Sequence, residues 1–421
     1  MLTALSIALS VAALLLSLLR SPRLELARHF LVFVALGAGN IYIAVVALSV
    51  LLFVNNGFRP PNRQFRRTEL IVLGMVGLIA LISLFSPITE RTIVKLLHLS
   101  FFVFILFQLM EEFASPDRIR LFMRCMVYAA LAVAVLGIGL SFIGVTEQPH
   151  IYLGRGSNEG SIFVTLMGIL PALTLMLWER RWHYLPMAAV MAVAPLLAVS
   201  RSNTAVAAVM LAGSFYFFFN RPALKAAMLV AAGVVIYQAR DLLSLQISSQ
   251  MNYSALQRIE LTRYGWNLWQ ERPWTGWGWG STSNLVPQAT LVEGEYPHFH
   301  NTWVQILAEA GVVGVLMIGL FAWFGLRCAW ISLVRLRSPA VSAYVTFALI
   351  SIVWLGMFEA LTFGADRMIQ LVLMMSIMGY MTSLALEARH RAATDEAGDS
   401  NPGILPAGQS VSKADAAGYQ R

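Results

Sequence analysis

Charged residues are scarce in this sequence. Only 12% of its 421 residues are Asp, Glu, Lys or Arg, whereas 58% are hydrophobic. A soluble domain carries roughly a quarter of its residues as charged side chains, so the composition excludes an ordinary soluble globular protein. The hydrophobic surplus falls into runs of about 17 to 25 residues, the length at which an α-helix crosses a bilayer. The sequence therefore predicts an all-α polytopic membrane protein.

Cysteine is also nearly absent. The chain contains only Cys125 and Cys328, each in or beside an apolar segment. Neither has the spacing of a CxxC motif or of a disulfide framework, so the sequence gives little support to a redox or zinc-binding function. The net charge of +8 would suggest nucleic acid binding in a soluble protein. In a membrane protein, short basic loops beside the bilayer explain this charge better.

Twelve apolar segments qualify as transmembrane helices, and the first lacks the basic flank and cleavage site of a signal peptide. Four regions follow: nine helices in 1–237, a long loop with short helices in 238–300, three helices in 301–386, and a tail in 387–421. We expect that tail to be disordered because it is rich in Ala, Gly, Asp and Ser. The expected spans are 2–19, 30–54, 69–86, 93–110, 121–145, 161–178, 185–199, 203–219, 223–237, 302–326, 340–360 and 368–386.

The orientation of the chain follows from its Lys and Arg residues, which are enriched in cytoplasmic loops. The larger share of them falls on the cytoplasmic side when the N-terminus is placed in the cytoplasm. Both termini are then cytoplasmic, and loop 238–300 lies outside. Arg201, between the seventh and eighth spans, faces the same outer side as this loop.

Arg201 is the first candidate for a functional residue. It lies in the stretch LLAVSRSNTAVAAV, and an arginine among apolar spans is costly unless it is paired or faces a solvated cavity. Such residues are functional candidates for this reason. The alternative is that Arg201 extends to the membrane interface or pairs with a loop carboxylate.

The segment QRIELTRYGWNLWQERPWTGWGWG, residues 257–280, is typical of an amphipathic helix that ends at Pro273 and is followed by a glycine-rich turn. Arginine binds phosphate through two parallel hydrogen bonds and keeps its charge, and tryptophan offers a flat face to a sugar or a lipid. The alternative is a helix that only lies on the outer leaflet. The segment contains three arginines and five tryptophans: Arg258, Arg263, Arg272, Trp266, Trp269, Trp274, Trp277 and Trp279.

The stretch PHFHNTW contains two histidines, His298 and His300. We expect them to point to opposite sides of an extended segment, so that only one faces a ligand. A metal site is not favoured, because zinc takes three or four ligands and no other Cys or His lies nearby in the sequence. A histidine here could be a cap or a packed residue, or it could exchange a proton near neutral pH. Asn301 is expected to cap the tenth span.

Gly311 and Gly314 follow within that span, where they would let neighbouring helices approach closely. The stretch HNTWVQILAEAGVVG thus has the pattern H-N, nine further residues, then G-x-x-G. It is preceded by RIELTRYGWNLWQERPWTGWG, which is similar to the signature R-[LI]-x-[IL] … P-x-x-G-x-G, and by SRSNTA at the start of a span. In this order of elements and in its twelve-span layout, the sequence resembles the O-antigen ligase and polymerase superfamily, although the N-terminal spans match only in hydropathy.

The resemblance implies a GT-C type glycosyltransferase, without metal or cofactor, at the periplasmic face of a Gram-negative inner membrane. The implied donor is O-antigen on undecaprenyl pyrophosphate, and the implied acceptor is a sugar of the lipid A–core oligosaccharide. By the same resemblance His300 is the catalytic base, and Arg201 and Arg258 hold the pyrophosphate. The residues expected to contact substrate are His298, Asn301, Arg263, Arg272, Trp277 and Trp279.

Three alternatives to a ligase remain. An O-antigen polymerase has the same loop motifs but extends the lipid-linked glycan itself. A protein O-oligosaccharyltransferase is disfavoured, since members of that branch usually carry an additional large periplasmic C-terminal region. A transporter for a lipid-linked sugar predicts charged or helix-breaking positions near the bilayer midplane and often repeat symmetry, and neither is evident in the sequence.

Overall fold

The computed structural model describes most of the expected spans and parts of the long loop. The described ranges are 25–37, 41–55, 67–86, 89–142, 157–198, 200–219, 258–285, 298–336, 338–358 and 365–399, with a few single positions near 8–15, 223–226 and 361. Within these ranges all regular secondary structure is helical, and no strand occurs. Six of their helices are long and apolar enough to cross a membrane, and three shorter apolar helices accompany them. The expected all-α, multi-pass architecture is confirmed.

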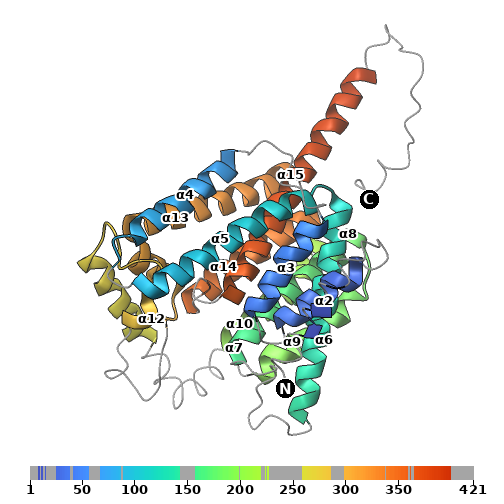
Figure 1. Ribbon diagram of the computed structural model, residues 1–421. Helices are drawn as coiled ribbons and strands as arrows, with labels where there is room; N and C mark the ends of the chain where they lie inside the picture. The colour runs from blue at the N-terminus through green and yellow to red at the C-terminus, as the bar shows by residue number, and fades with distance from the viewer. Residues whose placement is uncertain are drawn as a thin grey trace.

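The helices form one elongated bundle, with α12 at one end and the end of α15 projecting from the other (Figure 1). A further helix, 258–271, precedes α12. The labelled elements are α2 (Glu25–Gly37), α3 (Ile41–Asn55), α4 (Arg67–Ser83), α5 (Thr89–Glu112), α6 (Pro116–Phe142), α7 (Ser157–Phe163), the π-helical η2 (Val164–Ile169), α8 (Leu170–Glu179), α9 (Tyr184–Leu197), α10 (Arg201–Phe218), α12 (Thr282–Leu285), α13 (Thr302–Trp330), η3 (Ile331–Leu336), α14 (Pro339–Phe358) and α15 (Ala365–Asp399).

Two expected spans have a different internal structure. The span expected over 30–54 is divided between α2 and α3. The span expected over 161–178 contains the π-helical turn η2 directly before Pro171 in α8. Proline has no amide hydrogen and its ring crowds the preceding turn, and a widened turn relieves that crowding. Most of the segments 223–237 and 2–19 lies outside the described residues.

Helix α15 extends into the region that was expected to be a disordered tail. Helix α15 continues through residues 387–399, so the expectation of disorder from residue 387 is wrong for this stretch. The reason is local composition, because the stretch is rich in Ala, Glu and Arg, which favour helices intrinsically. Glu387 and Arg391 also form an ion pair one turn apart, at 3.8 Å. Residues 400–421 lie outside the described part of the chain.

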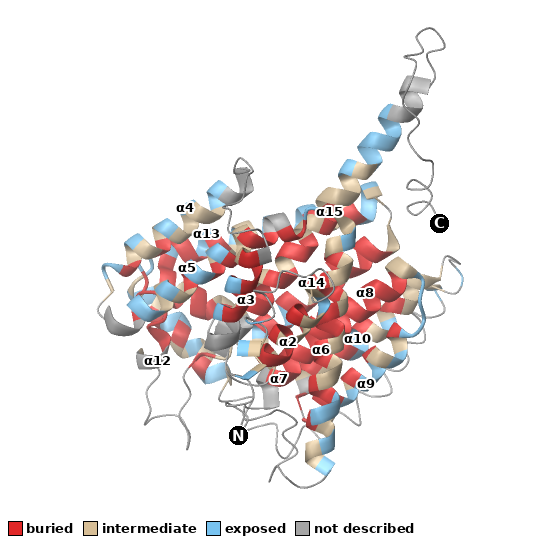
Figure 2. Ribbon diagram, turned by 45° about the vertical axis from the view of Figure 1, so that its right-hand side comes forward, coloured by how far each residue is buried: buried red, intermediate tan, exposed pale blue. Residues whose placement is uncertain are grey.

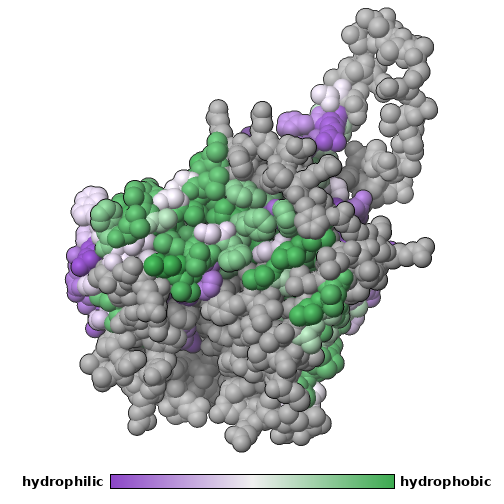
Figure 3. Space-filling model, in the orientation of Figure 1, coloured by the Kyte–Doolittle hydropathy of each residue, from purple (hydrophilic) through white to green (hydrophobic). Residues whose placement is uncertain are grey.

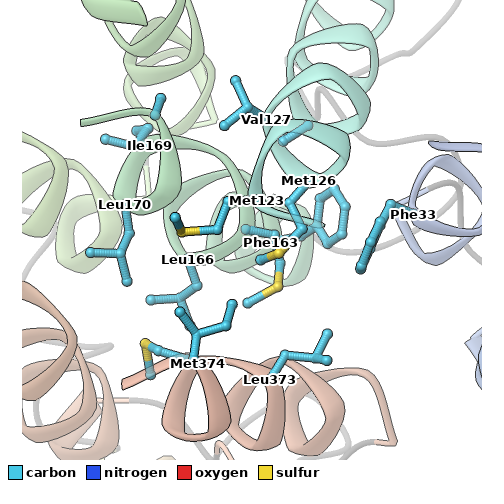
Figure 4. Close-up of a cluster of buried hydrophobic side chains, with 14 of the residues drawn as sticks. Phe33, Met123, Met126, Val127, Phe163, Leu166, Ile169, Leu170, Leu373 and Met374 are labelled. Atoms are coloured by element: carbon cyan, nitrogen blue, oxygen red, sulfur yellow. The ribbon is translucent and has the colours of Figure 1, made fainter. Parts of the chain in front are cut away.

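The centre of the bundle is the segment Gly160–Glu179, whose most apolar window is completely buried. Figure 2 shows buried residues filling the middle of the molecule. Around this segment, methionines of α6 and α15 interlock with Phe163 and Leu166 (Figure 4). Methionine is unbranched and polarisable, so it fills irregular gaps between helices. This core holds the helices in fixed positions relative to one another.

The outer surface of the bundle is apolar where it would face lipid. Large hydrophobic side chains are exposed on α4, α5 and α13, among them Leu70, Leu97 and Leu326. Figure 3 shows this apolar surface as a band that turns hydrophilic at the left end of the view and along the end of α15. Exposed apolar patches of this extent mark a membrane surface rather than a water-facing one.

The two ends of the bundle differ in their contacts. At one end, Trp303 near the start of α13 contacts Gly356 near the end of α14, where an added Cβ would lie 2.9 Å from the indole ring. The segment 258–285 lies at this same end, which we call the loop end. Ser86, before α5, donates a hydrogen bond to the carbonyl of Trp277 in this segment (2.7 Å).

The opposite end is closed by ion pairs, and it places the start of α10. Glu179 at the end of α8 pairs with Arg124 near the start of α6, at 2.6 Å. Trp182, three residues after Glu179, packs against Phe218 at the end of α10, with ring centroids 4.2 Å apart. Because α10 ends here, its first residue, Arg201, lies at the loop end of the bundle.

Candidate functional site

The helix 258–271 ends before Pro273, as the sequence predicted. Leu261 and Leu268 are buried in a cluster with Phe299 and Ala308 of α13. Gly265 lies between them, and a Cβ at this position would stand 2.6 Å from Val304 and 3.0 Å from Phe299. Only glycine therefore lets this helix approach the start of α13 so closely.

The three arginines of this segment occupy different environments. Arg258 is half-buried and is three residues before Leu261, so it lies on the inner face of the helix. Arg263 lies on the other face and is exposed. Arg272 follows the helix and places its guanidinium over the ring of Trp277, 4.3 Å from the centroid. Arg258 is thus the arginine of this helix that faces the start of α13.

The two histidines contact each other. Their ring centroids are 4.1 Å apart, with an angle of 67° between the planes, and the backbone amide of His300 donates to Nδ1 of His298 at 3.2 Å. The expectation that they point to opposite sides is wrong. Side chains two residues apart share one side of an extended chain, and His300 adopts a left-handed conformation with φ 51°, which brings its ring onto that of His298.

The pair is anchored by the residue between its members. Phe299 is completely buried, and Tyr264 of helix 258–271 packs edge-on against it, with centroids 6.3 Å apart. His298 is 6% exposed, whereas His300 is more accessible. The hydroxyl of Tyr264 donates to the carbonyl of Leu285 (2.9 Å), and burial raises the pKa of this phenol. Tyr264 therefore stays protonated at neutral pH, and a histidine remains the better candidate base.

Asn301 caps α13, as the sequence predicted. Its side-chain oxygen accepts hydrogen bonds from the backbone amides of Trp303 and Val304, both at 3.1 Å. Two amides of the first turn are thereby satisfied. The cap fixes the direction in which α13 leaves the histidine pair.

Helix α13 is broken at Gly311, which has φ 56° and ψ −133°. The break leaves backbone groups without their helical partners, and the turn after Pro273 supplies new ones. The carbonyl of Ala308 accepts from the amide of Trp277 (2.9 Å), the carbonyl of Glu309 accepts from Gly278 (2.9 Å), and the amide of Val312 donates to Trp274 (3.4 Å). Irregular backbone at membrane depth is tolerated only where protein satisfies it in this way.

The close approach of turn and helix requires glycine on both sides. A Cβ on Gly276 would lie 2.5 Å from the carbonyl of Glu309, and one on Gly311 would lie 2.7 Å from the amide of Gly276. Gly311 was expected to admit a neighbouring helix, but it admits this turn instead. A Cβ on Gly314 would meet the carbonyl of Ile306 in the same helix, at 2.5 Å.

The glycine-rich turn has no free amides with which to hold phosphate. All seven backbone amides from Gly276 to Thr282 donate to a protein acceptor. A phosphate-binding loop needs amides directed at the ligand. The charge of a phosphate bound beside this turn would therefore be met by groups other than the amides of residues 276–282.

Two of the tryptophans have structural roles. Trp279 is only 4% exposed and packs among Ile79, Leu99 and Ile306, so the expectation that it contacts substrate is wrong for this structure. Trp277 is half-buried, and its indole nitrogen donates to the carbonyl of Leu268 (3.0 Å). Arg272 covers one face of the Trp277 ring. Trp274, in contrast, is 74% exposed.

Glu309 is a buried residue of this end that no sequence motif assigned to the site. It is 2% exposed and accepts hydrogen bonds from the hydroxyl and the amide of Thr282 and from the side chain of Gln305 (3.2 Å). An ionisable residue inside an apolar run was the available signal, because such residues are functional candidates by default.

Arg201 begins α10 at the loop end, but its side chain lies outside the described part of the structure. Three other predicted residues, His298, His300 and Asn301, lie beside Phe299 at the start of α13, and Arg258 begins the helix that packs against Phe299. Within the described ranges, no group of three or more His, Cys, Asp or Glu residues could hold a metal ion.

Comparison with known protein families identifies the segment that contains these features. Residues 186–319 match the family model described as O-antigen ligase. The matched segment includes most of α9, all of α10, helix 258–271, the glycine-rich turn, the histidine pair and the break in α13. No curated protein matches the chain. The match over residues 186–319 supports an assignment to the O-antigen ligase family, and the chain has the apolar helices of a multi-pass membrane protein.

Proposed function

We propose that this protein is an O-antigen ligase that transfers O-antigen from undecaprenyl pyrophosphate to a sugar of the lipid A–core oligosaccharide, at the periplasmic face of the inner membrane. The observation that carries the proposal is the meeting of the family's histidine motif with the inner face of helix 258–271, at the end of the bundle where α10 also begins. The site uses no metal or cofactor.

The reaction needs a base and a means of stabilising the leaving group. An acceptor hydroxyl attacks the anomeric carbon of the donor sugar, the bond from that carbon to the pyrophosphate oxygen breaks, and the hydroxyl proton passes to the base. His300 is that base, because imidazole accepts a proton near neutral pH. Undecaprenyl pyrophosphate leaves as an anion, which Arg201 and Arg258 stabilise through charge-assisted hydrogen bonds.

The environments of these residues support the assignments. His298 is more buried than His300, and its Nδ1 already accepts from the backbone, so His300 is the more available base and His298 supports it. Arg258 is on the inner face of its helix, whereas Arg263 is exposed on the outer face. The amides of residues 276–282 are all occupied, which is consistent with arginine side chains binding the pyrophosphate.

The test is the lipopolysaccharide ladder of a strain from which this protein is deleted. A ligase predicts bare lipid A–core together with an accumulation of undecaprenyl-linked polymer, and both should revert when the wild-type chain is restored. A core capped with a single repeat would instead identify a polymerase. A normal ladder, or polymer retained on the cytoplasmic side, would overturn the proposal.

A further inference from the structure

We infer that Glu309 and Thr282 form a positioning latch that fixes the glycine-rich turn on broken helix α13 and thereby sets the place of the histidine pair. The inference rests on the proposed function for its catalytic consequence. The structural part, that this contact holds residues 276–282 in place, stands independently of what the protein transfers.

The latch consists of four donors that converge on one buried carboxylate. Glu309 accepts from the hydroxyl and the amide of Thr282, from the backbone amide of Gly280, and from the side chain of Gln305. In each of these four hydrogen bonds the carboxyl group is the acceptor. Lys95 of α5 interacts electrostatically with Glu309 and packs its methylene chain against Gly280.

The contact links three elements that are distant in the sequence. Glu309 belongs to α13, Thr282 begins α12 at the end of the turn, and Lys95 belongs to α5. Two further hydrogen bonds join the turn to the α4–α5 connection: Ser86 donates to the carbonyl of Trp277, and the amide of Trp279 donates to Ser83 (3.3 Å). The turn is thus held on both sides, and the buried carboxyl group of Glu309 is its anchor on α13.

The glycine-rich turn positions the residues around the histidines. Trp277, which lies inside the latched segment, donates to the carbonyl of Leu268 in helix 258–271. That helix packs against Phe299 through Leu261, Gly265 and Leu268. Phe299 stands between the two histidines in the sequence, so a shift of the turn would be transmitted through helix 258–271 and Phe299 to the imidazole rings.

A carboxylate is a costly anchor inside an apolar bundle. A buried ionisable group generally gives no more stability than well-packed apolar residues would, whereas its hydrogen bonds have direction and fix one register of the turn. The contact of one buried carboxyl group with four donors therefore contributes more to the position of the turn than to the stability of the fold. Glu309 itself does not touch the histidine rings in the described contacts, so it is a positioning residue and not a catalytic one.

The test compares two substitutions at one position. Thr282→Val removes the hydroxyl that donates a hydrogen bond to Glu309 and keeps the side-chain volume, whereas Thr282→Ser keeps the hydroxyl. Thr275→Val is the matched control, because the hydroxyl of Thr275 bonds only within the turn, to Gly276 (3.1 Å). Amide hydrogen exchange is measured over residues 276–282 in the purified full-length protein in detergent micelles. Transfer from undecaprenyl-linked glycan to lipid A–core is measured in parallel.

We expect exchange over 276–282 to rise about 10-fold in Thr282→Val, the consequence of losing one hydrogen bond to a charged group, and to stay near wild type in Thr282→Ser and Thr275→Val. We expect kcat of Thr282→Val to fall about 10- to 100-fold through misplacement of the site, with KM for the lipid-linked donor unchanged and with rescue in Thr282→Ser. Glu309→Gln should repeat both effects, since an amide presents donors where acceptors are needed.

Unchanged exchange in both Thr282→Val and Glu309→Gln would overturn the latch. Raised exchange with unchanged kcat would overturn its role in positioning. If the wild-type chain showed no glycosyl transfer at all, the proposed function would fail, while the exchange measurement would still decide whether the latch exists.

Discussion

The imidazole rings of His298 and His300 lie 4.1 Å apart, edge to face, with the completely buried Phe299 between them in sequence. The contact depends on the left-handed backbone at His300, whose φ is 51°. A side chain other than glycine pays roughly 1–2 kcal/mol for this conformation. Strain of this kind persists where the surroundings impose it and is concentrated at functional sites, which supports a role for the imidazole of His300.

The backbone and side-chain roles of His300 can be separated by substitution. Asparagine and glycine both tolerate a positive φ, whereas alanine does not. We expect His300→Asn and His300→Gly to keep or raise the thermal midpoint of the purified protein, and His300→Ala to lower it. All three should lower transfer by about 10²- to 10⁴-fold, the usual cost of losing a general base. Substantial transfer by His300→Asn would remove His300 as the base.

The arginines of helix 258–271 supply a test with an internal control. Arg258 is half-buried on the inner face and Arg263 is exposed on the outer face, so Arg258→Ala should lower transfer by about 100-fold, and Arg263→Ala should change it little. Arg258→Lys should recover poorly, because lysine keeps the charge but loses the bidentate geometry. Equal effects of the two alanine substitutions, measured as initial rates, would contradict the assignment of Arg258.

The orientation of the chain can be tested with two exposed positions at opposite ends of the bundle. Thr275 lies in the turn at the loop end, and Ala393 lies near the end of α15. The native cysteines, Cys125 and Cys328, are buried and should stay unlabelled. We expect Thr275→Cys to react with a membrane-impermeant maleimide in intact spheroplasts, and Ala393→Cys only after lysis. The reverse pattern would place the loop end in the cytoplasm.

Most of the bundle could be predicted from the sequence, because a run of apolar residues of sufficient length has one stable arrangement in a bilayer. The cap at Asn301 and the end of helix 258–271 at Pro273 also followed from local chemistry. No comparable local pattern indicated that the π-helical turn η2 would precede Pro171, or that α15 would extend through a polar stretch to Asp399.

The site was less predictable because its geometry depends on tertiary contacts. Trp279 was expected to contact substrate with its neighbour Trp277, but packing against α4, α5 and α13 buries it. The contact between the two histidines depends on a positive φ that only the surrounding structure imposes. The meeting of Glu309 with Thr282 joins residues 27 positions apart, which no local pattern reports.

Chelation supplies a further test of the site. The paired imidazoles of His298 and His300 offer at most two nitrogen ligands, Nδ1 of His298 already accepts a hydrogen bond, and the described residues provide no third ligand of the His, Cys, Asp or Glu type. Because zinc takes at least three protein ligands, we expect dialysis against EDTA to leave the rate of transfer unchanged. Loss of transfer that is restored by added zinc, and not by magnesium or by buffer alone, would identify a metal at the histidine pair.

The last prediction concerns Gly311, whose φ of 56° and ψ of −133° break α13. An alanine there would be strained, and its Cβ would lie 2.7 Å from backbone atoms of Trp274 and Gly276. We expect Gly311→Ala to lower the free energy of unfolding by about 2–5 kcal/mol through strain and overpacking. We also expect it to abolish transfer, because the glycine-rich turn can no longer pack against α13. Gly319→Ala is the control: eight residues along the same helix, a Cβ meets no described atom within 4 Å, so the higher helix propensity of alanine should make this change neutral or stabilising by up to about 1 kcal/mol. The measurement is the thermal midpoint of both variants in the same detergent. Equal midpoints would mean that the packing of the turn against α13 does not require a glycine at 311.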